Sequence, residues 1–129
     1  MSARVLDASA LLALLLEEPG AVHLQAEISE ALISAVNWSE VAAHFARNGV
    51  AAEAIMQVLD PLPFRVVPFD QQQALQAGLL ITATRSAGLS LGDRACLALA
   101  KQKGLPACTA DRAWLAVAEA VGVVVETIR

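Results

Sequence analysis

Four acidic residues of this 129-residue chain share one setting, in which each follows an apolar segment and stands at the start of a helical pattern. They are Asp7, Glu40, Asp93 and Asp111. If the apolar segments are parallel strands, their carboxyl ends meet at one edge of a sheet, where open α/β folds place their ligands. We therefore expect the four carboxylates to lie close together at that edge.

Such a cluster indicates a particular chemistry. Carboxylates within ~4–6 Å of one another repel and raise one another's pKa. A divalent cation relieves that repulsion, and Mg²⁺ or Mn²⁺ prefers oxygen ligands of this kind. The ion would polarise a phosphoryl oxygen and lower the pKa of a bound water, which is the chemistry of phosphoester hydrolysis. Ser9, Asn37 and Thr109 are small polar residues beside the acids that could orient ligands or waters.

Helix capping is the competing interpretation of the same residues. Asn37-x-x-Glu40 and Ser90-x-x-Asp93 both resemble a capping box, with a polar cap and an acid three residues later. Asp7 or Ser9 could cap the first helix and Asp111 a later one, and carboxylates are favourable at helix N-termini. Capping explains each acid singly, but it does not explain why four would gather at one edge.

The elements that must position these residues alternate along the chain. Apolar runs predict strands over residues 3–7, 31–36, 65–69, 105–109 and 123–128. Helical spacing and stop signals predict helices over residues 9–17, 21–29, 37–48, 51–59, 70–86, 92–103 and 111–121. Pro68 favours an edge position for the third strand. The pattern predicts one α/β domain over residues 1–129, with a mainly parallel sheet and helices on both faces.

Composition narrows the class of protein. Hydrophobic residues make up 57% of the chain and charged residues 17%, and the mean hydropathy is +0.55. We expect a large core together with an apolar face that a partner covers. The net charge of −4 argues against binding of nucleic acid through a broad basic surface, but not against a nuclease whose acidic pocket holds metal ions.

The remaining signals concern location. Cys96 and Cys108 form no CxxC pair, so we expect reduced core residues rather than a zinc site or a disulfide. The apolar run over residues 11–16 is shorter than the ~20 residues that span a bilayer. We expect a cytoplasmic protein with no membrane association.

The ordered set of motifs resembles the PIN domain. Asp7-x-Ser9, Asn37-x-x-Glu40, Asp93 at a helix start and Thr109-x-Asp111 occur in the family's order across the whole chain. Within that family the chain is most similar to the toxin ribonucleases of bacterial VapBC toxin–antitoxin pairs.

The resemblance implies a three-layer α/β/α sandwich and Mg²⁺- or Mn²⁺-dependent endonucleolytic cleavage of RNA. It also implies a homodimer or a toxin–antitoxin hetero-oligomer, with a cognate antitoxin protein that covers the active-site groove. By motif, Asp7, Glu40, Asp93 and Asp111 would form the acidic catalytic and metal-binding site, and Ser9 and Thr109 would be its polar accessories. It leaves open the RNA target, the antitoxin, the number of metal ions and whether Asp111 binds metal directly.

Basic residues and histidines are interpreted more simply. Arg94 and Arg112 each follow a site acid and could contact substrate phosphates or an antitoxin carboxylate, although surface salt bridges are an equal alternative. Arg47 belongs to a scattered set of basic residues that we expect mostly on a solvated face, with weak RNA contacts as the alternative. His44 is expected to be an ordinary, partly buried histidine rather than a general base.

Two other functions remain as alternatives. One is a different Mg²⁺-dependent phosphohydrolase or a phosphate-accepting receiver domain, although Ser9 stands where an aspartyl phosphatase has a second Asp, and Lys101 and Lys103 lie in the wrong segment for a receiver. The other is a non-catalytic interaction module, in which the acids are only caps and the apolar excess is a binding surface. No GxGxxG or GxSxG motif supports dinucleotide binding or serine hydrolysis.

Overall fold

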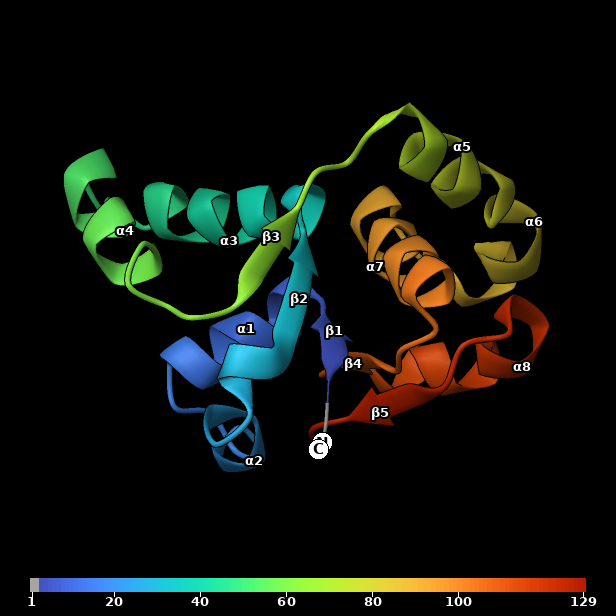
Figure 1. Cartoon of the computed structure of the whole chain (residues 1–129), viewed down its shortest axis with the longest axis horizontal. Coiled ribbons are helices and arrows are strands. Elements are labelled where there is room, and N and C mark those ends of the chain that lie inside the picture. The colour runs from blue at the N-terminus through green and yellow to red at the C-terminus, as the bar shows by residue number, and fades with distance from the viewer. Residues whose placement is uncertain (1–2) are drawn as a thin grey trace.

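A five-stranded parallel sheet forms the centre of the molecule in a computed structural model that describes residues 3–129 (Figure 1). The spatial order of the strands is β3-β2-β1-β4-β5, and every neighbouring pair is parallel. The strands are β1 (Arg4–Leu6), β2 (Ala31–Ser34), β3 (Arg65–Val67), β4 (Ala107–Thr109) and β5 (Val125–Thr127).

Helices connect the strands and cover both faces. Those before β3 are α1 (Ala8–Leu15), α2 (Val22–Gln25), the 3₁₀ turn η1 (Ile28–Glu30), α3 (Ala35–Arg47) and α4 (Ala52–Leu59). Those after it are α5 (Gln71–Leu79), α6 (Ile81–Thr84), η2 (Arg85–Ala87), α7 (Leu91–Lys103), η3 (Arg112–Ala116) and α8 (Ala118–Val121). Figure 1 shows the first group on one side of the sheet and the second group on the other. The expected three-layer α/β/α sandwich is therefore confirmed.

Two apolar cores separate the three layers. Because side chains alternate along a strand, Val5 and Ala107 pack with Leu97 of α7 and Trp114 of η3 on one face. Leu6 and Cys108, the next residues on the same strands, pack on the other face with residues of α1, α3 and α4. Both cysteines are buried free thiols, as expected. None of the helices within residues 3–129 has the length and apolar character needed to cross a membrane.

The strand order creates a switch point between β1 and β4. From β1 the chain adds β2 and then β3 on one side, and it returns to add β4 and β5 on the other. The helices that leave the carboxyl ends of β1 and β4 therefore diverge to opposite faces. In open parallel sheets the resulting crevice is the usual ligand site.

The predicted strands are all present, and β3 lies at the edge of the sheet as Pro68 indicated. The predicted helix over 70–86 is wrong as one unit, because it breaks into α5, α6 and η2 just after Gly78, a residue of low helix propensity. Residues 21–29 and 111–121 likewise each form a short α-helix and a 3₁₀ helix rather than one continuous helix.

The third predicted helix starts earlier than expected. It begins at Ala35, where the Ser34 hydroxyl accepts a hydrogen bond from the Val36 amide (3.2 Å) and caps it. Strand β2 thus runs into α3 without a loop. The predicted Asn37-x-x-Glu40 capping box is therefore wrong, since both residues lie inside the helix.

A glycine substitution tests the junction between the α1–α2 turn and the end of the sheet. Gly20 has φ +90°, and a Cβ there would overlap the backbone carbonyl of Ile128. Gly49 has a similar φ of +83° but open space around it. We expect Gly49→Ala to lower the free energy of unfolding by about 1 kcal/mol and Gly20→Ala by about 2–4 kcal/mol. Equal losses in urea denaturation would show that the Gly20 contact contributes nothing.

Candidate active site

The Asp7 carboxylate lies at the switch point and is tied to both neighbouring strands. The pairing of Leu6 with Cys108 places Asp7 beside Thr109. The Thr109 hydroxyl donates to Asp7 Oδ2 (2.6 Å), and the Ser9 hydroxyl lies 2.8 Å from Oδ1. The Ala10 amide donates to Oδ1 (2.8 Å), so Asp7 is also the N-cap of α1. These bonds fix the carboxylate in one orientation.

Burial makes Asp7 chemically unusual, since the residue is only 4% exposed. Its pKa is raised from 3.8 to about 6, chiefly because burial disfavours the charged form. Hydrogen bonds from Thr109, Ala10 and Ser9 oppose the rise, whereas the charge of Asp93 adds to it. A positively charged partner would therefore strongly stabilise the ionised form of the Asp7 carboxylate.

The Glu40 carboxylate is held across the start of α7. Buried Asn37 donates from Nδ2 to Glu40 Oε1 (2.9 Å) and to the Gly92 carbonyl (3.0 Å), which joins α3 to α7. A Cβ at Gly92 would collide with both carboxylate oxygens of Glu40. The absent side chain of Gly92 therefore creates the space in which Glu40 lies. Asn37 Oδ1 is buried without a hydrogen-bond partner in the described structure and could accept one from a ligand or water.

Asp93 and Asp111 cap helical segments, as the competing interpretation expected. Ser90 and Asp93 form a complete capping box at α7, in which the Ser90 amide donates to Asp93 Oδ2 (2.9 Å). Asp111 is exposed and caps η3 by accepting from the Ala113 amide (2.9 Å). Its own amide donates to Thr109 Oγ1 (3.1 Å), which links it to the Asp7 network. Capping thus fixes these carboxylates without removing them from the site.

All four acids line a single open pocket of about 290 Å³. The other lining residues are Ala8, Ser9, Leu12, His44 and Arg47. None of the ion pairs found in residues 3–129 includes Asp7, Glu40, Asp93 or Asp111. The pocket therefore concentrates negative charge that no lysine or arginine in the described part of the chain neutralises by direct pairing.

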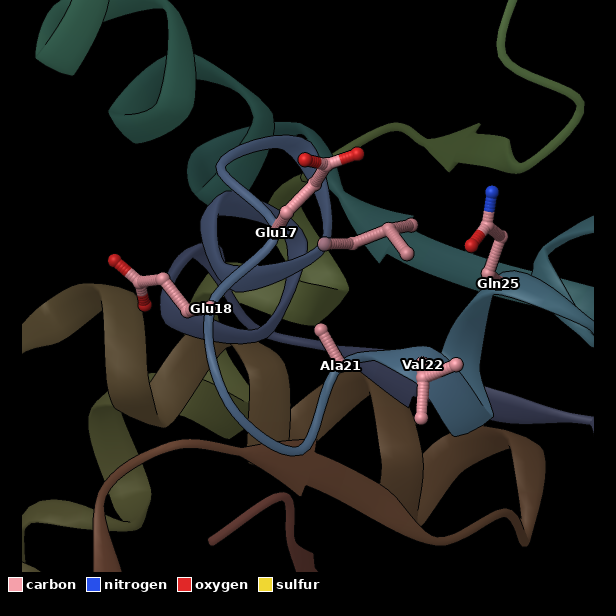
Figure 2. A pocket seen from close by; sticks show the side chains of 6 residues that line it. Glu17, Glu18, Ala21, Val22 and Gln25 are labelled. Carbon is pink, nitrogen blue, oxygen red and sulfur yellow. The ribbon is translucent and has the colours of Figure 1, made fainter.

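A different hollow lies at the other end of α1 (Figure 2). Glu17 and Glu18 line it with Leu14, Ala21, Val22 and Gln25, and Figure 2 shows the two carboxylates pointing apart. Glu18 is paired with Arg129 (3.2 Å). This hollow lacks converging polar groups and carries no site.

The acidic pocket suits a hydrated divalent ion better than a fully protein-ligated one. Within residues 3–129, no three Asp, Glu, His or Cys side chains converge closely enough to hold an ion together. Mg²⁺ commonly keeps several waters and is bound through one or two carboxylates. The donor set of carboxylates, hydroxyls and an unpartnered amide oxygen fits that kind of site.

The structure does not bring every candidate residue to the pocket. Arg94 turns towards α5, where its Nη1 donates to the Ala77 carbonyl (2.9 Å). Arg112 donates to the Arg129 carbonyl (3.1 Å) beyond the end of β5. His44 and Arg47, which the sequence interpretation set aside, do line the pocket. Their spacing of four and seven residues from Glu40 was the available signal, because it places all three on one helical stripe.

Comparison with known proteins identifies the family. The family model of the PIN domain matches residues 4–120, which is most of the chain. The chain belongs to the PIN domain family. PIN domains are generally nucleases and typically use divalent metal ions, in agreement with the chemistry of the acidic pocket.

Solved structures share the fold of this PIN domain at low sequence identity. A DNA-bound VapBC from Salmonella typhimurium has a TM-score of 0.75 at 18% identity and covers 100% of each chain. VapBC2 from Rickettsia felis, bound to a promoter DNA fragment, has a TM-score of 0.72 at 14% identity over 96% of this chain and 97% of that one. A toxin–antitoxin complex from Klebsiella pneumoniae has a TM-score of 0.64 at 22% identity, over 84% and 86%. A comparison with curated proteins gives no match.

The raised pKa of Asp7 predicts how the stability of this PIN domain depends on pH. Because the folded-state pKa lies above the unfolded-state value, the native protein retains a proton that the unfolded chain releases between about pH 4 and pH 6. The free energy of unfolding should therefore fall by roughly 3 kcal/mol as pH rises through that window, and remain at the lower level above it. Asp7→Asn should remove this loss.

Urea denaturation of wild-type and Asp7→Asn protein in EDTA measures the effect. The variant should gain stability relative to wild type between pH 4 and pH 7, although imperfect hydrogen bonding by the amide reduces the gain. Asp60→Asn is the control, because Asp60 is exposed at the end of α4 and carries no burial penalty. A stability difference for Asp7→Asn that is independent of pH would contradict the assignment.

Proposed function

We propose that this protein is a divalent-metal-dependent endoribonuclease and the toxin of a type II toxin–antitoxin system. The observation that carries the proposal is the pocket at the switch point, where four carboxylates gather without a basic ion-pair partner among residues 3–129. Capping accounts for the orientation of three of them, but it does not account for the concentration of unpaired charge. A metal ion that binds nucleic acid phosphates supplies the missing positive charge.

Asp7, Glu40 and Asp93 would hold Mg²⁺ or Mn²⁺, with Asp111 at the margin of the site. When bound, such an ion polarises a phosphoryl oxygen and lowers the pKa of water, which promotes phosphodiester hydrolysis. The proposal accommodates one ion or two, because the carboxylates are spread around the pocket rather than focused on one point.

Polar side chains of the protein would position the carboxylates. Ser9 and Thr109 hold Asp7 by its side-chain oxygens and prevent rotation of the carboxylate. Asn37 holds Glu40 through Oε1, which leaves Oε2 available to accept a proton from an attacking water. Asn37, although not at a helix cap, would thus keep its proposed supporting role by positioning Glu40.

RNA is proposed as the substrate, and an antitoxin protein as the partner, from the likeness to VapBC and other toxin–antitoxin structures. Exposed apolar side chains support covered surfaces on both helical layers: Met56 and Val58 on α4 in one layer, and Leu75 and Leu79 on α5 with Ile81 on α6 in the other. We propose that a second copy of the chain, the antitoxin or both cover these surfaces. A non-catalytic interaction module is the second candidate, because the caps formed by Asp7, Asp93 and Asp111 would be needed there too.

Cleavage of total cellular RNA by purified protein, with Mn²⁺ or with EDTA, tests the activity. We expect metal-dependent cutting by the wild type and at least a hundred-fold loss for Asp93→Asn, about the effect of removing a group that stabilises a transition state. Asparagine retains an oxygen for the Ser90 amide, so the helix cap and the fold should survive. Metal-independent cutting, or equal cutting by the variant, would contradict the proposed site.

Gly92→Ala tests the metal site without altering any carboxylate. The new methyl group must displace the Glu40 carboxylate, so Mn²⁺ affinity measured by isothermal titration calorimetry should fall about ten-fold or more. Gly78→Ala in α5 is the matched control, because a Cβ there meets nothing within 4 Å. The interaction module instead predicts no Mn²⁺ binding by any of these proteins.

A further inference from the structure

Arg47 lines the acidic pocket, but it has no role so far in the acidic site or in the packing of the protein. It lies at the C-terminal end of α3 and lines the same pocket as the four acids. Glu40, His44 and Arg47 stand at positions i, i+4 and i+7, so they share one stripe of the helix. The stripe leads from the acidic cluster to a cationic end about 10 Å away along the helix axis.

The guanidinium of Arg47 is exposed and available to a ligand. None of the ion pairs or side-chain hydrogen bonds described in residues 3–129 involves it. Arg94 and Arg112 differ in this respect, because they donate to backbone carbonyls, and Arg129 is paired with Glu18. Arg65 and Arg85 have no such bond among the described residues either, but they do not line the pocket. Arg47 is therefore a cation that lies beside an acidic pocket without being used to neutralise it.

We propose that Arg47 binds a phosphodiester of the RNA strand next to the scissile one and sets the direction in which the strand crosses the pocket. This inference rests on the proposed ribonuclease function. A phosphate bound near Glu40 and Asp93 leaves Arg47 roughly two helical turns away, too far for the same phosphate and suited to a neighbouring one. The planar guanidinium can donate two parallel hydrogen bonds to phosphate oxygens.

The geometry favours RNA over a protein carboxylate as the occupant. A nucleic acid strand carries a regular series of negative charges, so one strand can satisfy a metal-bearing acidic site and a separate cation together. A single carboxylate of a protein partner would meet Arg47 but would also face the repulsion of the nearby acids. His44, half-buried between Glu40 and Arg47, adds a ring surface over which the strand would pass.

Binding of a fluorescein-labelled single-stranded RNA of mixed sequence, measured by anisotropy in Mn²⁺, tests the proposal. The Asp93→Asn background slows turnover at least a hundred-fold and keeps the helix cap, and calorimetry first establishes the Mn²⁺ concentration that saturates it. Adding Arg47→Gln should weaken binding about ten-fold, the loss expected for a charge-assisted hydrogen bond. The plot of log affinity against log salt should become shallower by about 0.7, the value for one phosphate of a single strand. Arg47→Lys should recover the salt dependence but only part of the affinity.

Arg85→Gln is the matched control, because Arg85 is exposed in η2 on the opposite helical layer. It should leave RNA affinity and its salt dependence unchanged. Mn²⁺ affinity, measured separately by calorimetry, should be unchanged or higher in Arg47→Gln, since a positive charge beside the site is removed. This readout separates loss of an RNA contact from damage to the metal site.

Three outcomes would overturn the inference: equal losses for Arg47→Gln and Arg85→Gln, no RNA binding by the Mn²⁺-saturated Asp93→Asn protein, or RNA affinity unaffected by Arg47→Gln. Unchanged RNA affinity in Arg47→Gln would indicate that Arg47 instead binds a carboxylate of a protein partner. Failure of the ribonuclease proposal is distinguishable, because it would remove RNA cleavage by the wild type while the binding comparison still measures the role of Arg47.

Discussion

The seam between β1 and β4 depends on one buried carboxylate. Asp7 caps α1, accepts the Thr109 hydroxyl across the seam and is held by Ser9, so one side chain connects two strands and a helix. Burial of that charge is unfavourable, which is why its pKa is raised to about 6. The fold keeps this carboxylate in place with hydrogen bonds and leaves its charge to be balanced from the pocket.

Helix capping by Asp7, Asp93 and Asp111 is compatible with the metal binding proposed for these acids. Each cap engages a carboxylate with backbone amides, and the positive end of a helix partly offsets repulsion between neighbouring acids. Asp93 is the clearest case, since its capping box fixes the side chain at the first turn of a 13-residue helix. A carboxylate fixed in this way loses little conformational entropy when it meets an ion. The caps would therefore prepare the proposed metal site as well as starting the helices.

The sequence was sufficient for the fold because alternation of apolar strands and amphipathic helices is a strong local signal. It also led to the four acids: Asp7, Asp93 and Asp111 follow a strand or open a helix, whereas Glu40 lies inside α3 and still lines the pocket. It could not show that Asn37 lies inside α3 rather than at its start, because Ser34 is an equally good cap and only the tertiary structure selects between them. The break after Gly78 was missed because the packing of α5 and α6 against α7 and α8, not propensity alone, sets the direction of that segment.

Gly92 and Arg47 were beyond sequence reasoning for different physical reasons. Gly92 is important because its lack of a side chain leaves space for the Glu40 carboxylate. These two residues are 52 positions apart in the sequence. Arg47 looked like one basic residue among several, and its significance depends on which arginines the fold engages elsewhere. Sequence patterns indicate the spacing of apolar residues within one helix or strand. The roles inferred for Gly92 and Arg47 instead depend on contacts between elements.

The seam between β1 and β4 also determines when the site can assemble during synthesis of the chain. Asp7 and Thr109 are separated by 102 residues, so the central hydrogen bond of the site closes only after β4 has been synthesised and has inserted beside β1. Contacts of such sequence separation form late and slowly, because a long loop must be closed first. A nascent chain still attached to the ribosome would thus carry its acids on separate, unassembled segments. For a protein proposed to cut RNA, this delay would keep the enzyme inactive in the immediate surroundings of its own translation.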